Sequence, residues 1–360
     1  MLKIRYKSIK QMPNTNLTLS FKPKNVTKKL LSSLTDRAKL VVTKRYGLDK
    51  DGEKMTLEAI GEQYSITRER VRQIEHAALQ NIRKSSAYKQ EKAAFDELLQ
   101  VVDSLGGLLS EEDLLSLLAK DVSSRNHVCF MLVIGEEFKK EKEDVEFKHR
   151  WHIDQNLSKK IHEAIRKLYK SLDDESLIPE SEILQEFLKN LQDVNQKYLT
   201  EEIAKRWLSV SKNLDKNPLG EWGKANSSNV RTKGIRDYAF LAMRKHGSPI
   251  HFRDIAKQIE KLFDKKAHIA TTHNELIKDK RFVLVGRGLY ALSEWGYLSG
   301  VVKDVIKKVL EKNGPLTKEE IIQKVLKERY VKENTILVNL QNSKLFKKDK
   351  EGRYRYVENE

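Results

Sequence analysis

The chain has 360 residues, of which 69 are Lys or Arg and 52 are Asp or Glu, so its net charge is +17. Charged residues make up 34% of it and hydrophobic residues 39%, and only 16 Gly and 6 Pro interrupt it. This composition excludes collagen, a disulfide-stapled scaffold and low-complexity disorder, and it favours a protein built mostly of helices. The longest apolar run, residues 128–134, is far shorter than the ~18 residues that a membrane-spanning helix needs, so we expect no membrane partner.

The charge is unevenly distributed along the chain. Residues 1–90 carry 20 basic and 8 acidic side chains, residues 91–230 carry 20 and 27, and residues 231–360 carry 29 and 17. Two basic ends therefore flank an acidic middle. Either these charges are solvated helix faces, or both ends meet a polyanion while the middle meets protein, because charge reports on partners rather than on fold.

Residues 1–29 form a basic arm, which suits either a phosphate-contacting tail or a merely solubilising one. Residues 1–10 contain no signal-peptide core. The single cysteine, Cys129, has apolar neighbours and allows neither an internal disulfide nor a thiolate metal cluster. We therefore expect a buried thiol and a cytoplasmic protein.

Residues 56–84 predict a helix-turn-helix. Apolar residues at helical spacing indicate a first helix that ends near Ser65, and Thr67 is a good N-cap for a second one. The second helix has an apolar stripe made of Val71, Ile74, Ala78 and Ile82. Two amphipathic helices joined by so short a turn form a helix-turn-helix, although an ordinary helical hairpin with a charged surface has the same pattern.

The start of the second helix presents polar side chains away from that stripe. They are Arg68, Glu69, Arg72 and Gln73. These residue types match the edges of DNA bases, since Arg pairs with guanine, Glu accepts from the cytosine amino group and Gln pairs with adenine. The pattern therefore predicts DNA binding.

Residues 34–84 resemble region 4 of the housekeeping sigma factors of bacterial RNA polymerase. The segment LTDRAKLVVTKRYGL is similar to the first helical half of that region, and TLEAIGEQYSITRERVRQIEHAALQNIR to its recognition half. The resemblance implies that the second helix docks on the −35 promoter element, with double-stranded promoter DNA and the core RNA polymerase as partners. It implies base reading by Arg68, Glu69 and Gln73 and phosphate positioning by Thr67, Arg70 and Arg72. It also implies contact of the first half with the polymerase flap, at Leu40, Val41, Lys44 and Arg45.

A working sigma factor also needs an aromatic-rich region that melts the promoter and grips the polymerase. The residues before Leu34 contain no Trp, and nothing after Lys84 looks like such a region. We therefore expect that this chain does not open promoters unaided.

Beyond Tyr88 the chain repeats itself loosely. Four times an amphipathic helix is followed by a short apolar segment, a new helix start and a further helix, and usually by a strand–turn–strand pattern. Three helices with such a hairpin make a winged helix. The predicted fold is therefore mainly α, a helix-turn-helix domain followed by tandem winged-helix domains with small β-wings. After the arm, the expected boundaries are 30–88 for the helix-turn-helix domain and 92–154, 157–226, 231–298 and 299–358 for the winged-helix units.

Three of these units have clear predicted wings, at residues 138–152, 281–292 and 346–357, whereas the unit at 157–226 has only a degenerate one. The third unit resembles the HARE helix-turn-helix family, known from the delta subunit of bacterial RNA polymerase, through HGSPIHFRDIAKQI and RFVLVGRGLYALSEWGY. That family also occurs fused to chromatin regulators and restriction enzymes, so the resemblance implies association with DNA.

The third helices and wings of the last two units supply candidate secondary DNA contacts. In the third unit these are Thr271, Thr272, His273, Lys278 and Arg287; in the fourth they are Lys332, Asn334, Thr335, Lys347, Lys348 and Arg353. Basic wings contact phosphates, which fixes position without reading sequence. A solvated surface hairpin is the alternative.

Motifs for catalysis are missing from the sequence. It has no Walker loop and no glycine-rich dinucleotide fingerprint, and His149 and His152 fall on opposite faces of a predicted strand. We expect no enzyme, no cofactor, no metal site and no small-molecule substrate, and we expect the four Trp residues in cores or seams. The sequence thus predicts a sigma-factor-like DNA-binding transcription protein. The alternatives are a polymerase-bound modulator that does not read DNA, and the DNA-targeting subunit of a restriction or genome-defence system.

Overall fold

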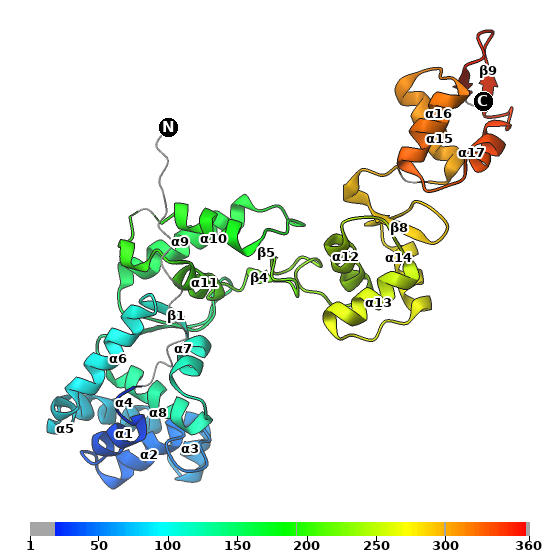
Figure 1. Ribbon diagram of the computed structural model, residues 1–360. Coiled ribbons are helices and arrows are strands. Elements are labelled where there is room, and N and C mark those ends of the chain that lie inside the picture. Colours follow the sequence, from blue (N-terminus) through cyan, green and yellow to red (C-terminus); the bar gives the residue numbers. More distant parts are fainter. Residues whose placement is uncertain (1–18, 192, 299, 358–360) are drawn as a thin grey trace. The chain divides into compact units, whose positions relative to one another are not determined.

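The computed structural model describes residues 19–191, 193–298 and 300–357, so most of the predicted basic arm lies outside the described residues. The described chain divides into two compact units. The first comprises residues up to 173 together with Pro179–Asp215, and the second comprises Asp174–Ile178 and the residues from 216 on. Both are mainly helical with small antiparallel sheets, as the sequence predicts (Figure 1).

The first unit contains α1 to α11 and one small sheet. Its helices are α1 (Pro23–Leu31), α2 (Asp36–Tyr46), α3 (Leu57–Gln63), α4 (Arg68–Lys84), α5 (Ser86–Gln90), α6 (Lys92–Ser104), α7 (Glu111–Leu118), α8 (Val122–Ile134), α9 (Gln155–Ser171), α10 (Glu180–Lys189), the 3-10 helix Gln196–Tyr198 and α11 (Glu201–Ser209). Strands β1 (Leu108–Ser110), β3 (Arg150–His152) and β2 (Lys139–Glu141) pair antiparallel in that order. The predicted first wing is confirmed as the β2–β3 hairpin.

Helix α8 lies at the centre of the first unit. It is apolar on nearly all sides, and most of its residues from Asn126 to Ile134 are buried. It packs against α1, α2 and α4 (Figure 1). The Asn126 amide donates to the carbonyl oxygens of Gly47 and Gly52 at 3.0 and 2.8 Å. The Arg83 guanidinium, from the end of α4, donates to the carbonyls of Val133 and Ile134 at 2.8 and 3.0 Å. The helix-turn-helix segment and the segment after it therefore share one hydrophobic core.

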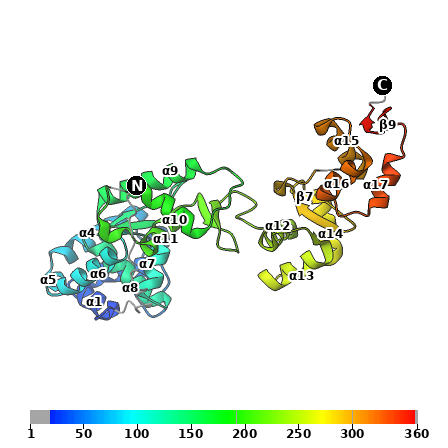
Figure 2. The same ribbon diagram turned by 45° about the horizontal axis from the view of Figure 1, so that its top comes forward.

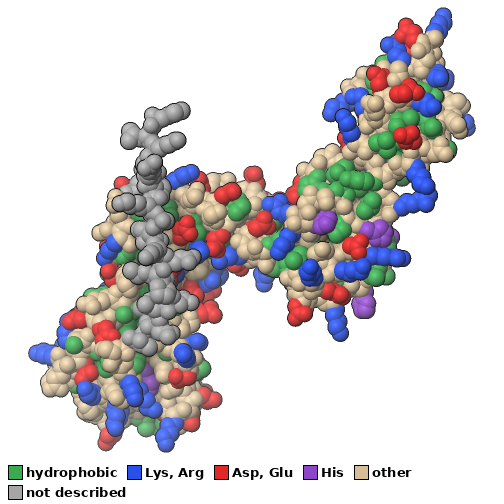
Figure 3. All heavy atoms as spheres, in the orientation of Figure 1, with side chains coloured by type: hydrophobic (Ala, Val, Ile, Leu, Met, Phe, Trp, Pro, Cys, Tyr) green, Lys and Arg blue, Asp and Glu red, His purple; other side chains and the backbone are tan. Residues whose placement is uncertain are grey.

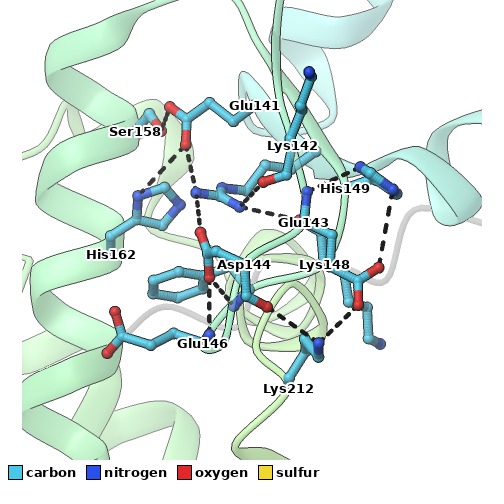
Figure 4. A network of polar contacts seen from close by, with 12 residues as sticks. Glu141, Lys142, Glu143, Asp144, Glu146, Lys148, His149, Ser158, His162 and Lys212 are labelled. Carbon is cyan, nitrogen blue, oxygen red and sulfur yellow. Dashed lines mark hydrogen bonds and ion pairs between the residues drawn. The ribbon is translucent and has the colours of Figure 1, made fainter.

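Polar contacts hold the first wing against α9 and Lys212, which follow it in the chain. Arg150, whose side chain is 6% exposed, pairs with Glu141 at 2.6 Å and with Asp144 at 3.1 Å. In Figure 4, Ser158 and His162, both from α9, point toward Glu141; the Ser158 hydroxyl donates to it at 3.0 Å. The Lys212 ammonium pairs with Glu143 at 2.7 Å. The acidic residues of this wing therefore bind basic residues of the same chain, and they connect the wing to the segment that follows it.

These contacts should make the first unit sensitive to acid. Burial lowers the pKa of His162 to about 4, and the neighbouring Arg150 acts in the same direction, whereas Glu141 opposes them. In the unfolded chain a histidine binds its proton near pH ~6.5. The stability contributed by neutral His162 is therefore fully present above that pH. It is lost as the pH falls toward the pKa of about 4 that His162 has in the folded protein. We expect the free energy of unfolding to fall by about 2 kcal/mol between pH ~7.5 and ~5. Urea unfolding at the two pH values measures this, and His162→Phe, which cannot titrate, should show a smaller loss. Equal losses in both proteins would assign the acid sensitivity to other groups.

The second unit contains two successive helix-and-hairpin bodies. Its helices are α12 (Ile235–His246), α13 (Phe252–Phe263), α14 (Ile269–Lys278), the 3-10 helix Ser293–Trp295, α15 (Val302–Asn313), α16 (Lys318–Glu328) and α17 (Glu333–Leu340). Its strands are β5 (Trp222–Lys224), β6 (Ile250–His251), β7 (Phe282–Leu284), β8 (Leu289–Leu292), β9 (Phe346–Lys348) and β10 (Tyr354–Tyr356), while β4 (Leu214–Lys216) spans the boundary of the units. Helices α12 to α14 gather beside β7, and α15 to α17 beside β9 (Figure 2).

The two later predicted wings are confirmed as hairpins. Strands β6, β8 and β7 form one antiparallel sheet, and β9 pairs with β10. The turn between β7 and β8 contains Gly288 with a φ of +73°, a conformation that favours glycine. This turn region contacts the second of the two bodies, formed by α15 to α17 and the β9–β10 hairpin, since the Tyr330 amide donates to the Val285 carbonyl at 2.7 Å. The β7–β8 wing thus connects the two bodies of the second unit.

The predictions about the tryptophans and the cysteine are confirmed as well. Trp151, Trp207 and Trp222 are buried, and Trp295 packs against a hydrophobic cluster. Cys129 is buried, and this burial raises the pKa of its thiol. Within the part of the chain that the structure describes, no helix is long and apolar enough to cross a membrane, and no group of three or more His, Cys, Asp or Glu could hold a metal ion.

Candidate nucleic-acid interface

The turn between α3 and α4 is defined by two caps and one close approach. The Thr56 hydroxyl accepts from the Ala59 amide at 3.1 Å and caps α3, and the Thr67 hydroxyl accepts from the Arg70 amide at 3.2 Å and caps α4. In α3, a Cβ on Gly61 would lie 2.6 Å from the Ile66 carbonyl oxygen, closer than side chains permit. Only glycine therefore allows the turn to pack this tightly against α3.

One face of α4 is buried, which fixes the rotation of the helix. Val71 is fully buried with Val41 and Ile60 in a small core between α2, α3 and α4. Further along α4, Ala78 and Ile82 join the larger core around α8. The predicted apolar stripe is confirmed, with Ile74 half-buried beside it.

The exposed start of α4, with its N-cap, carries the predicted DNA-contacting residues. All six of them are exposed: Thr67, Arg68, Glu69, Arg70, Arg72 and Gln73. The Arg72 guanidinium donates to both oxygens of Glu69 at 2.8 Å, and the Gln73 amide donates to Glu69 at 3.4 Å. The hydrogen bond from Arg72 holds the pKa of Glu69 below its usual value, so this carboxylate stays ionised at neutral pH. The network holds hydrogen-bond donors and an acceptor side by side at the start of the helix.

The four residues predicted to contact the polymerase flap do not form one exposed surface. Val41 is 1% exposed and packs in the small core, which leaves it no surface for a partner. Lys44 pairs with Asp49 at 2.9 Å. The Arg45 guanidinium donates to the Met55 carbonyl at 3.1 Å. Of the four residues, Leu40 alone is exposed, with 39% of its surface accessible to solvent.

The candidate contacts in the body formed by α12 to α14 and the β7–β8 hairpin are divided between surface and core. Thr272 is fully buried, and its hydroxyl donates to the His268 carbonyl at 3.0 Å. His273 stacks on Phe252 with ring centroids 4.3 Å apart. These two side chains therefore stabilise the fold, whereas Thr271, Lys278 and Arg287 are exposed.

In the body formed by α15 to α17 and the β9–β10 hairpin, most candidates are exposed. These are Lys332, Asn334, Thr335, Lys347 and Lys348. Arg353 is half-buried and pairs with Asp349 at 3.1 Å and with Glu351. The sequence interpretation missed Arg355, which lies directly opposite Lys347 in the β9–β10 pair. Its position between Tyr354 and Tyr356 in a strand was the signal, because alternate residues face opposite sides.

Comparisons with known proteins concern the helix-turn-helix segment. Residues 30–84 match the family described as Sigma-70, region 4. RNA polymerase sigma factor SigA of Clostridium acetobutylicum is 46% identical over 68 residues, which cover 19% of this chain and 18% of that protein. SigA of Listeria monocytogenes is 49% identical over 63 residues, or 18% of this chain and 17% of that protein. The chain thus spans less than a fifth of the length of these curated relatives. Residues 30–84 are therefore a sigma-70 region 4 domain, with α3 and α4 as its helix-turn-helix.

Proposed function

We propose that this protein is a sigma-factor-like, DNA-binding transcription protein that binds promoter DNA through α4 and acts in transcription initiation or its regulation. The observation that carries the proposal is the two-sided placement of α4. Its apolar face is locked into two cores, while all six candidate DNA-contacting residues are exposed at its start. A rigid helix with a polar, exposed N-terminal turn is the geometry that enters a major groove.

The residues divide into two roles in this proposal. Arg68, Glu69 and Gln73 read base edges. Thr67, Arg70 and Arg72 position the phosphates, helped by the free amide groups at the helix N-terminus, which attract anions. The proposal assigns the chain no catalytic step, and it places the protein in the cytoplasm with DNA and core RNA polymerase as partners.

Substitution of the ion-paired residues tests these roles. Glu69→Ala should relax the preference at one base pair by about 1–3 kcal/mol, because the acceptor for that base is lost. Arg72→Ala should weaken binding to all sequences alike, because a phosphate contact is lost. Fluorescence anisotropy against duplexes in which each base pair of a −35 element is varied separates the two effects.

Because Arg72 holds Glu69 through two hydrogen bonds, the two substitutions should not be additive. The double variant measures that coupling. Asn81→Ala, an exposed site near the far end of α4, is the matched control and should bind as the unchanged protein does. Unchanged binding by both Glu69→Ala and Arg72→Ala at low salt would show that α4 is not the recognition helix.

The placement of the first half of region 4 favours DNA over the polymerase flap as the main ligand. Lys44 and Arg45 are engaged within the domain and Val41 is buried, so a flap contact rests mainly on Leu40. A modulator that binds only polymerase would retain core polymerase at high salt without preferring any DNA sequence. A restriction or genome-defence subunit would co-purify with a nuclease or methyltransferase. A genome-wide map of bound DNA, read beside polymerase occupancy, distinguishes the three.

A further inference from the structure

The three clear wings of this chain differ in what covers them. The β2–β3 wing is fastened to α9 and to Lys212, and the β7–β8 wing is paired with Tyr330. Among the residues that the structure describes, the β9–β10 hairpin packs its inner face on a core, through Phe346, Tyr354 and Tyr356. Its outer face carries Lys347 and Arg355, which are both exposed. Basic and acidic side chains are both exposed on the part of the protein that carries β9 (Figure 3).

The outer face of this hairpin holds an uncompensated pair of like charges. Lys347 and Arg355 are direct cross-strand partners in the antiparallel register. Side chains in that relation lie about 5 Å apart at Cβ, and like charges there destabilise a hairpin. Among the described residues neither makes an ion pair, because the nearby carboxylates Asp349 and Glu351 both bind Arg353.

An anion placed over this face would remove the repulsion. Lys344 and Lys350 lie at the start and the tip of the same hairpin and are also exposed. Four cations along one hairpin suit an extended line of negative charges better than a single carboxylate. Long, flexible basic side chains contact phosphates in this way without reading bases.

We propose that the outer face of the β9–β10 wing, centred on Lys347 and Arg355, binds the phosphate backbone of double-stranded DNA without sequence preference. The choice of DNA as the polyanion rests on the function proposed above, whereas the charge pair does not. The wing is then the second anchor of a chain whose sequence reading is done by α4.

The test uses the full chain with Lys347→Ala and Arg355→Ala combined. Loss of two phosphate contacts should lower the slope of log K against log salt concentration by about 2, and should weaken binding at about 100 mM salt by roughly tenfold or more. Promoter and scrambled duplexes should be affected equally. Lys303→Ala combined with Lys312→Ala removes the same charge from exposed sites on α15 and should change the slope by much less.

Two further measurements keep the result interpretable. The melting temperature of the wing variant should not fall, because a repulsive pair has been removed; a fall would assign the pair a structural role and overturn the proposal. The second measurement is binding of the wing variant to vesicles of anionic phospholipid. A wing variant that loses vesicle binding but keeps its DNA slope would also overturn it.

The outcome also separates this proposal from the function assigned to α4. An Arg68→Ala, Gln73→Ala variant should lose sequence preference and keep the salt-dependent binding of the wing. If that variant behaves as expected while the wing variant keeps its slope, the wing proposal is wrong and the function of α4 stands. If the wing variant alone has an effect, the function of α4 is wrong and the wing proposal stands.

Discussion

Gly61→Val is expected to unfold the helix-turn-helix and to abolish sequence-specific DNA binding. Even a single Cβ at this position would lie 2.6 Å from the Ile66 carbonyl oxygen, which belongs to the backbone and cannot rotate away. We expect the free energy of unfolding of the first unit to fall by about 3 kcal/mol, the upper range for overpacking a tight site.

Circular dichroism during urea unfolding and anisotropy with a −35 duplex measure the two effects. Gly234→Ala is the matched control, because a Cβ there would meet nothing closer than 4.0 Å. Wild-type unfolding and binding by Gly61→Val would mean that α3 and the turn are farther apart in solution than in this structure.

Phe130→Ala should have an effect of similar size from outside the region 4 domain. Phe130 is fully buried in α8, and its ring meets the edge of Tyr46 of α2 with centroids 5.2 Å apart. Removing a buried phenyl group costs about 3–5 kcal/mol. Because α1 and α2 rest on α8, specific DNA affinity should be lost together with stability.

Leu276→Ala serves as the control for Phe130→Ala. Leu276 is 1% exposed in α14, so its truncation should destabilise the second unit and leave the region 4 domain able to bind. Calorimetry combined with DNA titration checks both variants. If Phe130→Ala still bound DNA specifically at a temperature where its first unit has lost stability, region 4 would not depend on α8.

Local signals in the sequence predicted much of this architecture. Helical periodicity and the cap at Thr67 located α4, and the strand–turn–strand pattern at residues 281–292 marked the β7–β8 hairpin. These features depend on neighbours within a few residues, which is why they can be recognised without a structure.

Features that depend on distant contacts were not predicted. Residues 128–134 stood out only as an apolar run, although in the structure they form the centre of the core that region 4 shares. Val41 was grouped with Leu40 for the flap, yet neighbours on a helix face different directions and α2 is only weakly amphipathic. That two wings connect to later segments depends on partners such as Lys212 and Tyr330, which lie tens of residues away in the chain.

The core shared through α8 couples the proposed DNA-binding helix to helices outside the region 4 domain. A ligand that binds only the folded state adds about 2.7 kcal/mol to stability at a concentration of 100 times its dissociation constant. Since α4 and α6 to α8 contribute to one core, a ligand bound at α4 would also stabilise α6 to α8. A duplex bound at α4 in the way proposed above would thereby make local opening of α6 to α8 rarer, and a partner that binds these helices only when they are folded would bind the DNA-bound protein more tightly.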